Sequence, residues 1–367
     1  MRSSKRRLVW LVALLATVGL VAGACGSDDK SSATDSTSAT GGGAAPADFD
    51  FEALSGTING SGATFPASFY QEAIAEMEDL ASDLTVNYNP VGSGQGKKDL
   101  GAGTSDWAGS DSTVKDEEKA QFAGPFLYFP TVAAPITVSF NVDGVDELDL
   151  SAETLAKIFM GEITTWDDPA IAAENSDADL PSTAITVAVR SDGSGTTSNF
   201  SKYLAAAAPS VFTLTAGDTV AWPKSSAGKG NAGVAQIIKD TDGAIGYVDL
   251  SDATASDLTF ASIQNKDGNY VAPTLDGASA ALAGADIKAD LTYSALDAAG
   301  AESYPITAGT YVLVYETISD ATQAEAIRGW LTFLLTDGQD LAPEVDFAPL
   351  PVELRDKALA QIDKIKG

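Results

Sequence analysis

The 367-residue sequence predicts an α/β fold with a largely parallel sheet. Short apolar, β-branched segments alternate with segments whose apolar residues recur at helical spacing, a pattern typical of βαβ units. Glycine-rich turns follow several strand segments, at points where a strand gives way to a helix. With 44% apolar residues the chain can bury a large core, and its length suits two domains or one large one.

The first residues predict an exported, membrane-anchored protein. A basic head precedes an apolar run at 8–21, which is too short to span a bilayer and fits a secretory signal peptide. Small residues then lead to Cys25, and this boundary resembles a bacterial lipobox, with Ala22 where leucine is usual. We therefore expect a signal peptide over 1–24, removed before lipidation of Cys25. The alternative is an ordinary secretion signal with an unrelated cysteine.

A flexible linker is expected after the anchor, over residues 25–50, because this stretch is rich in Ser, Thr, Gly, Ala and Asp. An anchor followed by such a linker would hold the folded part at the outer face of the cytoplasmic membrane.

The folded part reads as alternating elements. Residues 57–59 predict a short strand that ends in a glycine turn, and 66–80 predict a helix with Pro66 suited to its first turn. Residues 151–160 predict an amphipathic helix with an N-cap serine and Glu153 in its first turn. Further strands are expected at 84–88, 107–110, 131–140, 184–190, 244–248 and 311–315, with helical segments at 97–100, 196–204, 234–239 and 322–335.

Composition excludes several classes of function. The chain has no histidine, so a Ser-His-Asp triad, a Cys-His pair and a His-ligated metal site are impossible. Its single cysteine excludes an internal disulfide and a CxxC motif. Without residues 1–24, the chain has 18 basic against 51 acidic residues, a net charge of −33. Such a field disfavours nucleic acid as a partner, and we expect no metal and no cofactor.

Three glycine-rich loops lie between a predicted strand and a helix, at 60–66, 92–96 and 191–197, the last preceded by Arg190. Helix N-termini present unpaired N–H groups and a partial positive charge, so three such ends facing one point would form an anion site. Taken singly, each loop could be a plain capped helix start. A P-loop is excluded at 92–98, because Val91 stands where that motif needs glycine and Lys98 where it needs Ser or Thr.

Four segments together resemble the phosphate-binding protein of the Pst-type ABC phosphate importer. They are Gly-Ala-Thr-Phe-Pro at 62–66, Val-Gly-Ser-Gly at 91–94, Ala-Gly-Ser-Asp at 108–111 and Arg-Ser-Asp-Gly-Ser-Gly-Thr at 190–196. The resemblance runs from about Ser55 to the C-terminus. It implies a two-lobed, type II periplasmic-binding-protein-like fold, with lobe I at 51–133 plus 306–367 and lobe II at 134–305. Two hinge segments near 132–135 and 304–307 would join the lobes, with phosphate in the cleft.

The resemblance also implies the site. Backbone N–H groups and hydroxyls of the three loops would hold the anion, Arg190 would supply the one positive charge, and Asp192 would orient that arginine. The implied phosphate contacts are Thr64, Phe65, Ser93, Asp111, Arg190, Ser194, Gly195 and Thr196. The implied partners are inorganic phosphate and the permease subunits of an ABC transporter, and no catalysis is expected.

Asp111 predicts selectivity for phosphate. A carboxylate repels an anion unless the ligand brings a proton, and phosphate near neutral pH still carries a P–O–H that an ionised Asp can accept. Sulfate has no such proton, so its oxygen would face a carboxylate without hydrogen between them. Taken alone, Asp111 could simply cap the segment that follows it.

Two alternatives remain open from the sequence. The first is a binding protein for another tetrahedral oxyanion, of which arsenate is protonated like phosphate. The second is a secreted phosphatase, for which the sequence offers no nucleophile and base. The net charge of −33 further predicts that an anionic ligand associates faster as salt screens the field.

Overall fold

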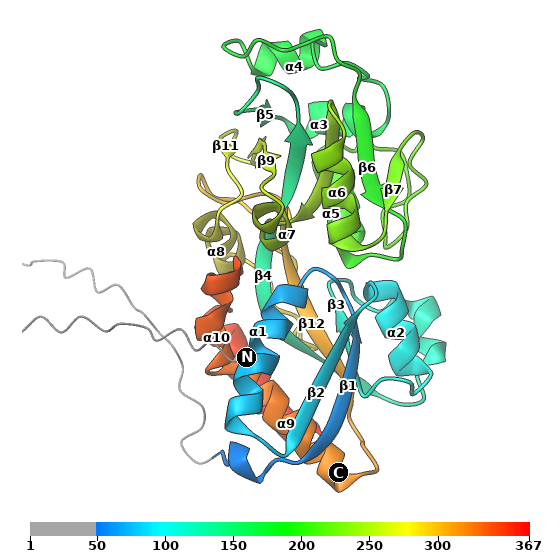
Figure 1. Cartoon of the computed structure of the whole chain (residues 1–367), viewed down its shortest axis with the longest axis vertical. Helices are drawn as coiled ribbons and strands as arrows, with labels where there is room; N and C mark the ends of the chain where they lie inside the picture. The colour runs from blue at the N-terminus through cyan, green and yellow to red at the C-terminus, as the bar shows by residue number, and fades with distance from the viewer. Residues whose placement is uncertain (1–48) are drawn as a thin grey trace, which may run out of the picture. The chain divides into compact units, whose positions relative to one another are not determined.

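A computed structural model of the chain describes residues 49–367. Within these residues a nine-stranded sheet has the order β2-β1-β3-β12-β4-β8-β6-β7, with β9 paired to β4, and a three-stranded sheet has the order β11-β10-β5. Helices alternate with the strands along the chain (Figure 1). The predicted α/β class is therefore confirmed.

The strands are β1 (Gly56–Gly62), β2 (Leu84–Pro90), β3 (Trp107–Ser110), β4 (Phe126–Asn141), β5 (Asp149–Leu150), β6 (Thr186–Arg190), β7 (Ser226–Gly228), β8 (Ala244–Asp249), β9 (Thr259–Phe260), β10 (Ser262–Gln264), β11 (Tyr270–Val271) and β12 (Thr307–Tyr315). The α-helices are α1 (Ala67–Leu80), α2 (Ser93–Gly101), α3 (Ala152–Phe159), α4 (Pro169–Glu174), α5 (Gly195–Ala207), α6 (Gly230–Asp240), α7 (Leu250–Ala255), α8 (Leu275–Ala283), α9 (Ala321–Leu335), α10 (Gly338–Leu341) and α11 (Val352–Gln361). Short 3₁₀ helices are η1 (Phe51–Ala53), η2 (Asp116–Gln121), η3 (Ala342–Val345) and η4 (Ile362–Lys364).

The large sheet is parallel at both ends and antiparallel at its centre. β1 pairs in parallel with β2 and β3, and β6 pairs in parallel with β7 and β8. β12 is antiparallel to both β3 and β4, and β4 is antiparallel to β8. The sequence prediction of a largely parallel sheet thus holds for the two ends. The centre differs because β4 and β12 run in opposite directions between them.

β4 and β12 connect the two ends of the sheet (Figure 1). β4 pairs with β12 up to Pro135 and with β8 from Ile136 onward. Proline has no N–H to donate to a ladder, so Pro135 suits the point where the strand changes partner. The predicted hinge segments fall here, since Pro135 lies opposite Thr307. The lobe boundaries themselves stay a prediction.

An aromatic cluster holds together α1, which follows the loop at 60–66, and β3, which precedes Asp111. The rings of Tyr70, Trp107 and Trp330, from α1, β3 and α9, pack with centroids 5.4–6.5 Å apart, and all three side chains are fully buried. Because burial of each aromatic ring stabilises the fold by a few kcal/mol, the cluster anchors α1 and β3 against α9.

The predicted signal peptide, Cys25 and nearly all of the predicted linker lie outside the described residues. Phe49, next to the predicted end of the linker, packs against the core with its ring 4.9 Å from that of Phe51. No helix in the described part is both long and apolar enough to cross a membrane.

Candidate functional site: a buried carboxylate and arginine at three helix starts

The loops after β2, β3 and β6 meet at one point. The Oγ of Ser93 accepts hydrogen bonds from the backbone N–H groups of Asp111 and Gly195, each 3.2 Å long. A Cβ on Gly195 would lie 2.6 Å from the Cβ of Asp111 and 2.7 Å from the Oγ of Ser93, so only glycine fits there. The structure therefore brings together three loops that are up to 102 residues apart in sequence.

Helix α2 begins earlier than expected. The glycine segment at 92–96 forms the first turn of the helix, which starts at Ser93 with Gly92 as its N-cap. Glycine is needed inside this turn because a Cβ on Gly96 would lie 2.4 Å from the Cα of Gly62 in β1. The close approach of α2 to β1 is what directs the N-terminus of α2 toward the loop after β1.

Asp111 is buried in this meeting point, with 4% of its surface exposed. Its Oδ1 accepts a 2.8 Å hydrogen bond from the hydroxyl of Thr310, and its Oδ2 lies 3.4 Å from the hydroxyl of Ser93. Burial raises the pKa of the Asp111 carboxyl to about 7, even though these hydroxyls and the charge of Arg190 oppose the rise. The carboxyl is thus poised to gain or lose a proton near neutral pH.

Arg190 lies at the end of β6 with its guanidinium held from two sides. Its Nε donates to Oδ1 of Asp192 at 2.9 Å, and Nη2 pairs with Oδ2 of the same carboxylate. Its Nη1 donates to Oδ1 of Asn231 at 2.7 Å and lies 3.4 Å from the hydroxyl of Thr196. This two-pronged contact agrees with the expected orienting role of Asp192.

The charge of Arg190 also sets the ionisation of Asp192. Burial by itself raises the pKa of the Asp192 carboxyl, but the hydrogen bonds and charge of Arg190 outweigh burial and bring that pKa below its usual value. Asp192 therefore stays ionised and also accepts the backbone N–H of Gly230 at 3.0 Å.

The remaining predicted residues lie after β6 and on the loop between β1 and α1. Ser194 is the N-cap of α5, and its Oγ accepts the N–H of Thr197 at 3.1 Å. Thr64 precedes α1, and its Oγ1 accepts the N–H of Asn231 at 3.3 Å, across 167 residues of sequence. Phe65 is buried with its ring against Phe347, which fixes the backbone of its loop.

Sequence analysis missed two residues of this arrangement. Thr310 lies in the middle of β12, and Asn231 lies in the first turn of α6 and is fully buried. Asn231 links Arg190 to Asp249, whose Oδ2 accepts its Nδ2 at 2.6 Å. The Gly-Lys-Gly-Asn segment at 228–231 is a sequence motif that could indicate Asn231 as a site residue, whereas no motif in the sequence around Thr310 does so.

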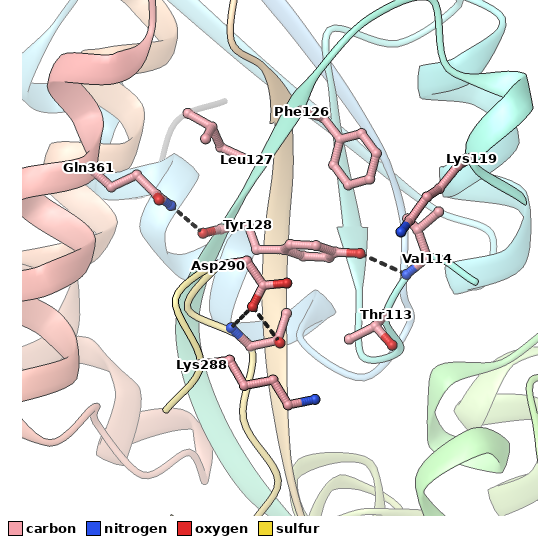
Figure 2. Close-up of a pocket in the computed structure, with 10 residues that line it drawn as sticks. Thr113, Val114, Lys119, Phe126, Leu127, Tyr128, Lys288, Asp290 and Gln361 are labelled. Carbon is pink, nitrogen blue, oxygen red and sulfur yellow. Dashed lines mark hydrogen bonds between the residues drawn. The ribbon is translucent and has the colours of Figure 1, made fainter. Parts of the chain in front are cut away.

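Two cavities reach these residues. One of about 140 Å³ reaches Asp111 and Asn199, and another of about 240 Å³ is lined by Thr64, Asp192 and Asn231 among others. A third cavity, of about 330 Å³, lies beside Tyr128 (Figure 2).

Comparison with known proteins identifies the family. Residues 31–338 match the model of the PBP superfamily domain. The chain is 36% identical over 310 residues to Phosphate-binding protein PstS of Pasteurella multocida (strain Pm70), covering 83% of this chain and 89% of that one. It is 33% identical over 368 residues to Phosphate-binding protein PstS3 of Mycobacterium bovis (strain BCG / Pasteur 1173P2), covering 96% and 97%.

Solved structures agree on the fold. A high affinity periplasmic phosphate-binding protein, crystallised with phosphate, superposes with a TM-score of 0.70 at 23% identity, covering 83% of this chain and 94% of that chain. This supports a two-lobed periplasmic-binding fold, and the curated relatives are binding proteins rather than enzymes. The chain belongs to the PstS family of phosphate-binding proteins, within the PBP superfamily.

Proposed function

We propose that this protein captures inorganic phosphate outside the cytoplasm and delivers it to the permease of an ABC transporter. The observation that carries the proposal is the buried carboxyl of Asp111 beside Ser93 and Gly195, with Arg190 held by Asp192 close by. A site of neutral donors, one arginine and one carboxyl is suited to an anion that still carries a proton.

The proposed contacts follow the three helix starts. Backbone N–H groups at the starts of α1, α2 and α5 have no partner within their helices and carry partial positive charge. The phosphate contacts we propose are Thr64, Phe65, Ser93, Asp111, Arg190, Ser194, Gly195 and Thr196. These groups come from elements at both ends of the large sheet and are in contact in this structure, so opening and closing of the two lobes would release and hold the ligand.

Calorimetric titration of the ligand-free protein tests the proposal. At pH 9, where the Asp111 carboxyl is ionised, we expect one-to-one binding of phosphate, binding of arsenate, and far weaker binding of sulfate. Asp111→Asn is expected to lower the ratio of phosphate affinity to sulfate affinity by at least tenfold, because the amide can donate a hydrogen bond to a fully ionised oxygen. Asp143→Asn, at an exposed position, is the matched control and is expected to leave both anions unchanged. Equal binding of phosphate and sulfate by the unaltered chain contradicts the proposal.

Anchoring through Cys25 is a separate part of the proposal, supported by the sequence of the signal peptide. The chain expressed in a bacterium with lipoprotein-processing enzymes is expected to fractionate with membranes and to carry lipid mass on its N-terminal peptide. Cys25→Ser is expected to lose the lipid and still bind phosphate. A wild-type chain that is secreted without lipid contradicts this part alone.

A further inference from the structure

Two adjoining cavities share lining residues, and Asp111 lines the smaller of them. The larger, about 330 Å³, is lined by Thr113, Lys119, Lys288 and Thr292, and Figure 2 shows the first three of these side chains around Tyr128. The smaller, about 140 Å³, shares Thr113, Lys288 and Thr292 with it and ends at Asp111. The two cavities lie side by side at these shared residues, and we call them together the passage.

Lysines surround this passage. Lys119 and Lys288 line the larger cavity, and Lys202 and Lys288 line the smaller one. Burial lowers the pKa of the Lys202 ammonium; the charge of Asp218 opposes the lowering, and repulsion by Lys97, Lys115 and Lys288 adds to it. Among residues 49–367, no carboxylate oxygen lies within 4.0 Å of the Nζ of Lys115, Lys202 or Lys288.

Few negative charges offset these lysines. Asp290 lines the larger cavity, where its Oδ1 accepts both the N–H and the hydroxyl of Thr292, at 3.1 and 2.7 Å. Lys119 pairs with Asp116 at 2.7 Å, but both side chains are largely exposed, so water screens the pair. The lining of the passage thus has three lysines, Lys119, Lys202 and Lys288, against the carboxyls of Asp111 and Asp290, in a chain whose net charge is −29.

The opening beside Asp192 and Asn231 is lined by fewer lysines than the passage. Its cavity of about 240 Å³ is lined by one lysine, Lys229, and by two carboxylates, Asp192 and Asp252. Since Asp192 is already paired with Arg190, an anion that approaches from that side meets the charges of Lys229 and Asp252.

We propose that the lysine-lined passage, formed by Lys119, Lys202 and Lys288 with Lys115 nearby, guides phosphate to Asp111 and accelerates its capture. This inference rests on the proposed function. The ammonium groups attract the anion over about a Debye length, roughly 10 Å at 0.1 M salt, while the same salt screens more distant carboxylates. The local charges therefore dominate the approach, and phosphate association is expected to slow as salt rises, the reverse of the dependence predicted from net charge.

The rate constants of [³²P]phosphate test the passage. The dissociation rate constant is measured by chase with unlabelled phosphate and filter capture, and Kd is measured by equilibrium dialysis. The association rate constant is the dissociation rate constant divided by Kd. At about 10 mM salt, each of Lys202→Ala and Lys288→Ala is expected to slow association about two- to fourfold, with dissociation unchanged. The difference is expected to vanish near 1 M salt, where the Debye length is about 3 Å. Lys288→Arg is expected to keep the wild-type rate.

Two lysine variants serve as controls. Lys157→Ala changes the net charge equally at a position that pairs with Glu153 on α3, and is expected to leave association unchanged. Lys229→Ala tests the opening beside Asp192 and Asn231. Equal slowing by Lys229→Ala, unchanged association in the Lys202 and Lys288 variants, or an effect on dissociation alone would overturn the proposal. Absence of phosphate binding by the wild-type chain would instead contradict the proposed function.

Discussion

The hydroxyl of Thr310 donates a 2.8 Å hydrogen bond to Oδ1 of Asp111, across 199 residues of sequence. The register between β12 and β4 shifts between Gly309 and Tyr311, so Thr310 occupies an irregularity of the strand. Such irregularities turn a side chain away from the regular alternation of a strand. Here it directs a donor at the carboxyl that we propose to distinguish phosphate from sulfate, on a strand that connects the two ends of the sheet.

Thr310→Val tests this contact. The substitution keeps the shape of the side chain but removes the donor, which costs about 1–2 kcal/mol when the acceptor is charged, or roughly tenfold in Kd. We expect the loss of phosphate affinity at pH 8, where Asp111 is ionised, and a smaller loss at pH 6. Isothermal titration at both pH values measures it. Thr307→Val, on the same strand and bonded to Tyr304 O, is the matched control and is expected to have little effect on Kd.

The pH dependence of sulfate binding tests the proton on Asp111. Since burial raises the pKa of Asp111 to about 7, its carboxyl is protonated below that pH and can donate to a sulfate oxygen. We expect sulfate affinity to rise about tenfold per pH unit from pH 9 to about 7 and to level off below. Asp111→Asn is expected to bind sulfate equally across this range. Sulfate binding by the wild-type protein that does not change with pH contradicts the assignment.

The same pKa shift predicts how the ligand-free protein responds to pH. A carboxyl whose folded pKa is raised contributes stability that is fully present below its unfolded pKa of 3.8 and is lost as pH rises through about 7. Between pH 5 and 8 this contribution falls by roughly 2–3 kcal/mol. Asp111→Asn is expected to flatten the profile by that amount, measured by urea unfolding without phosphate. Comparison with the variant isolates Asp111, because Asp249, whose pKa burial also raises, is the same in both proteins.

Lys97 is expected to be essential for the stability of the fold. It is fully buried on α2, and its Nζ pairs with Glu118 at 2.9 Å and Asp218 at 2.8 Å. Removal of one partner from a buried ion pair leaves an uncompensated charge, which costs about 3–5 kcal/mol. We expect Lys97→Met to lower the free energy of unfolding in urea by this amount.

Two further variants check the origin of that loss. Lys97→Met combined with Asp218→Asn is expected to recover part of it, since one of the two unpaired charges is gone. Lys157→Ala, which breaks an exposed pair with Glu153, is expected to cost less than about 1 kcal/mol. A loss for Lys97→Met as small as that of Lys157→Ala would contradict the prediction.

Local contacts explain which parts of the site the sequence predicts. Ser194 caps α5 through the N–H of Thr197, three residues away, and Arg190 pairs with Asp192, two residues away. Ser151 caps α3 in the same manner, as expected from its position before Glu153. These contacts depend on the chain within one turn, so a pattern of residue types reveals them.

The sequence by itself determined the α/β class, the glycine-rich helix starts and, through the resemblance of four short segments, the residues proposed to hold the anion. The tertiary structure decided which distant groups complete the site. Thr310 bonds Asp111 across 199 residues, and Lys97 bonds Asp218 across 121. Such partners depend on strand order, on the antiparallel centre of the sheet and on the irregularity in β12. No local pattern encodes these features, because the free energy of each long-range contact is gained only after the whole sheet has assembled.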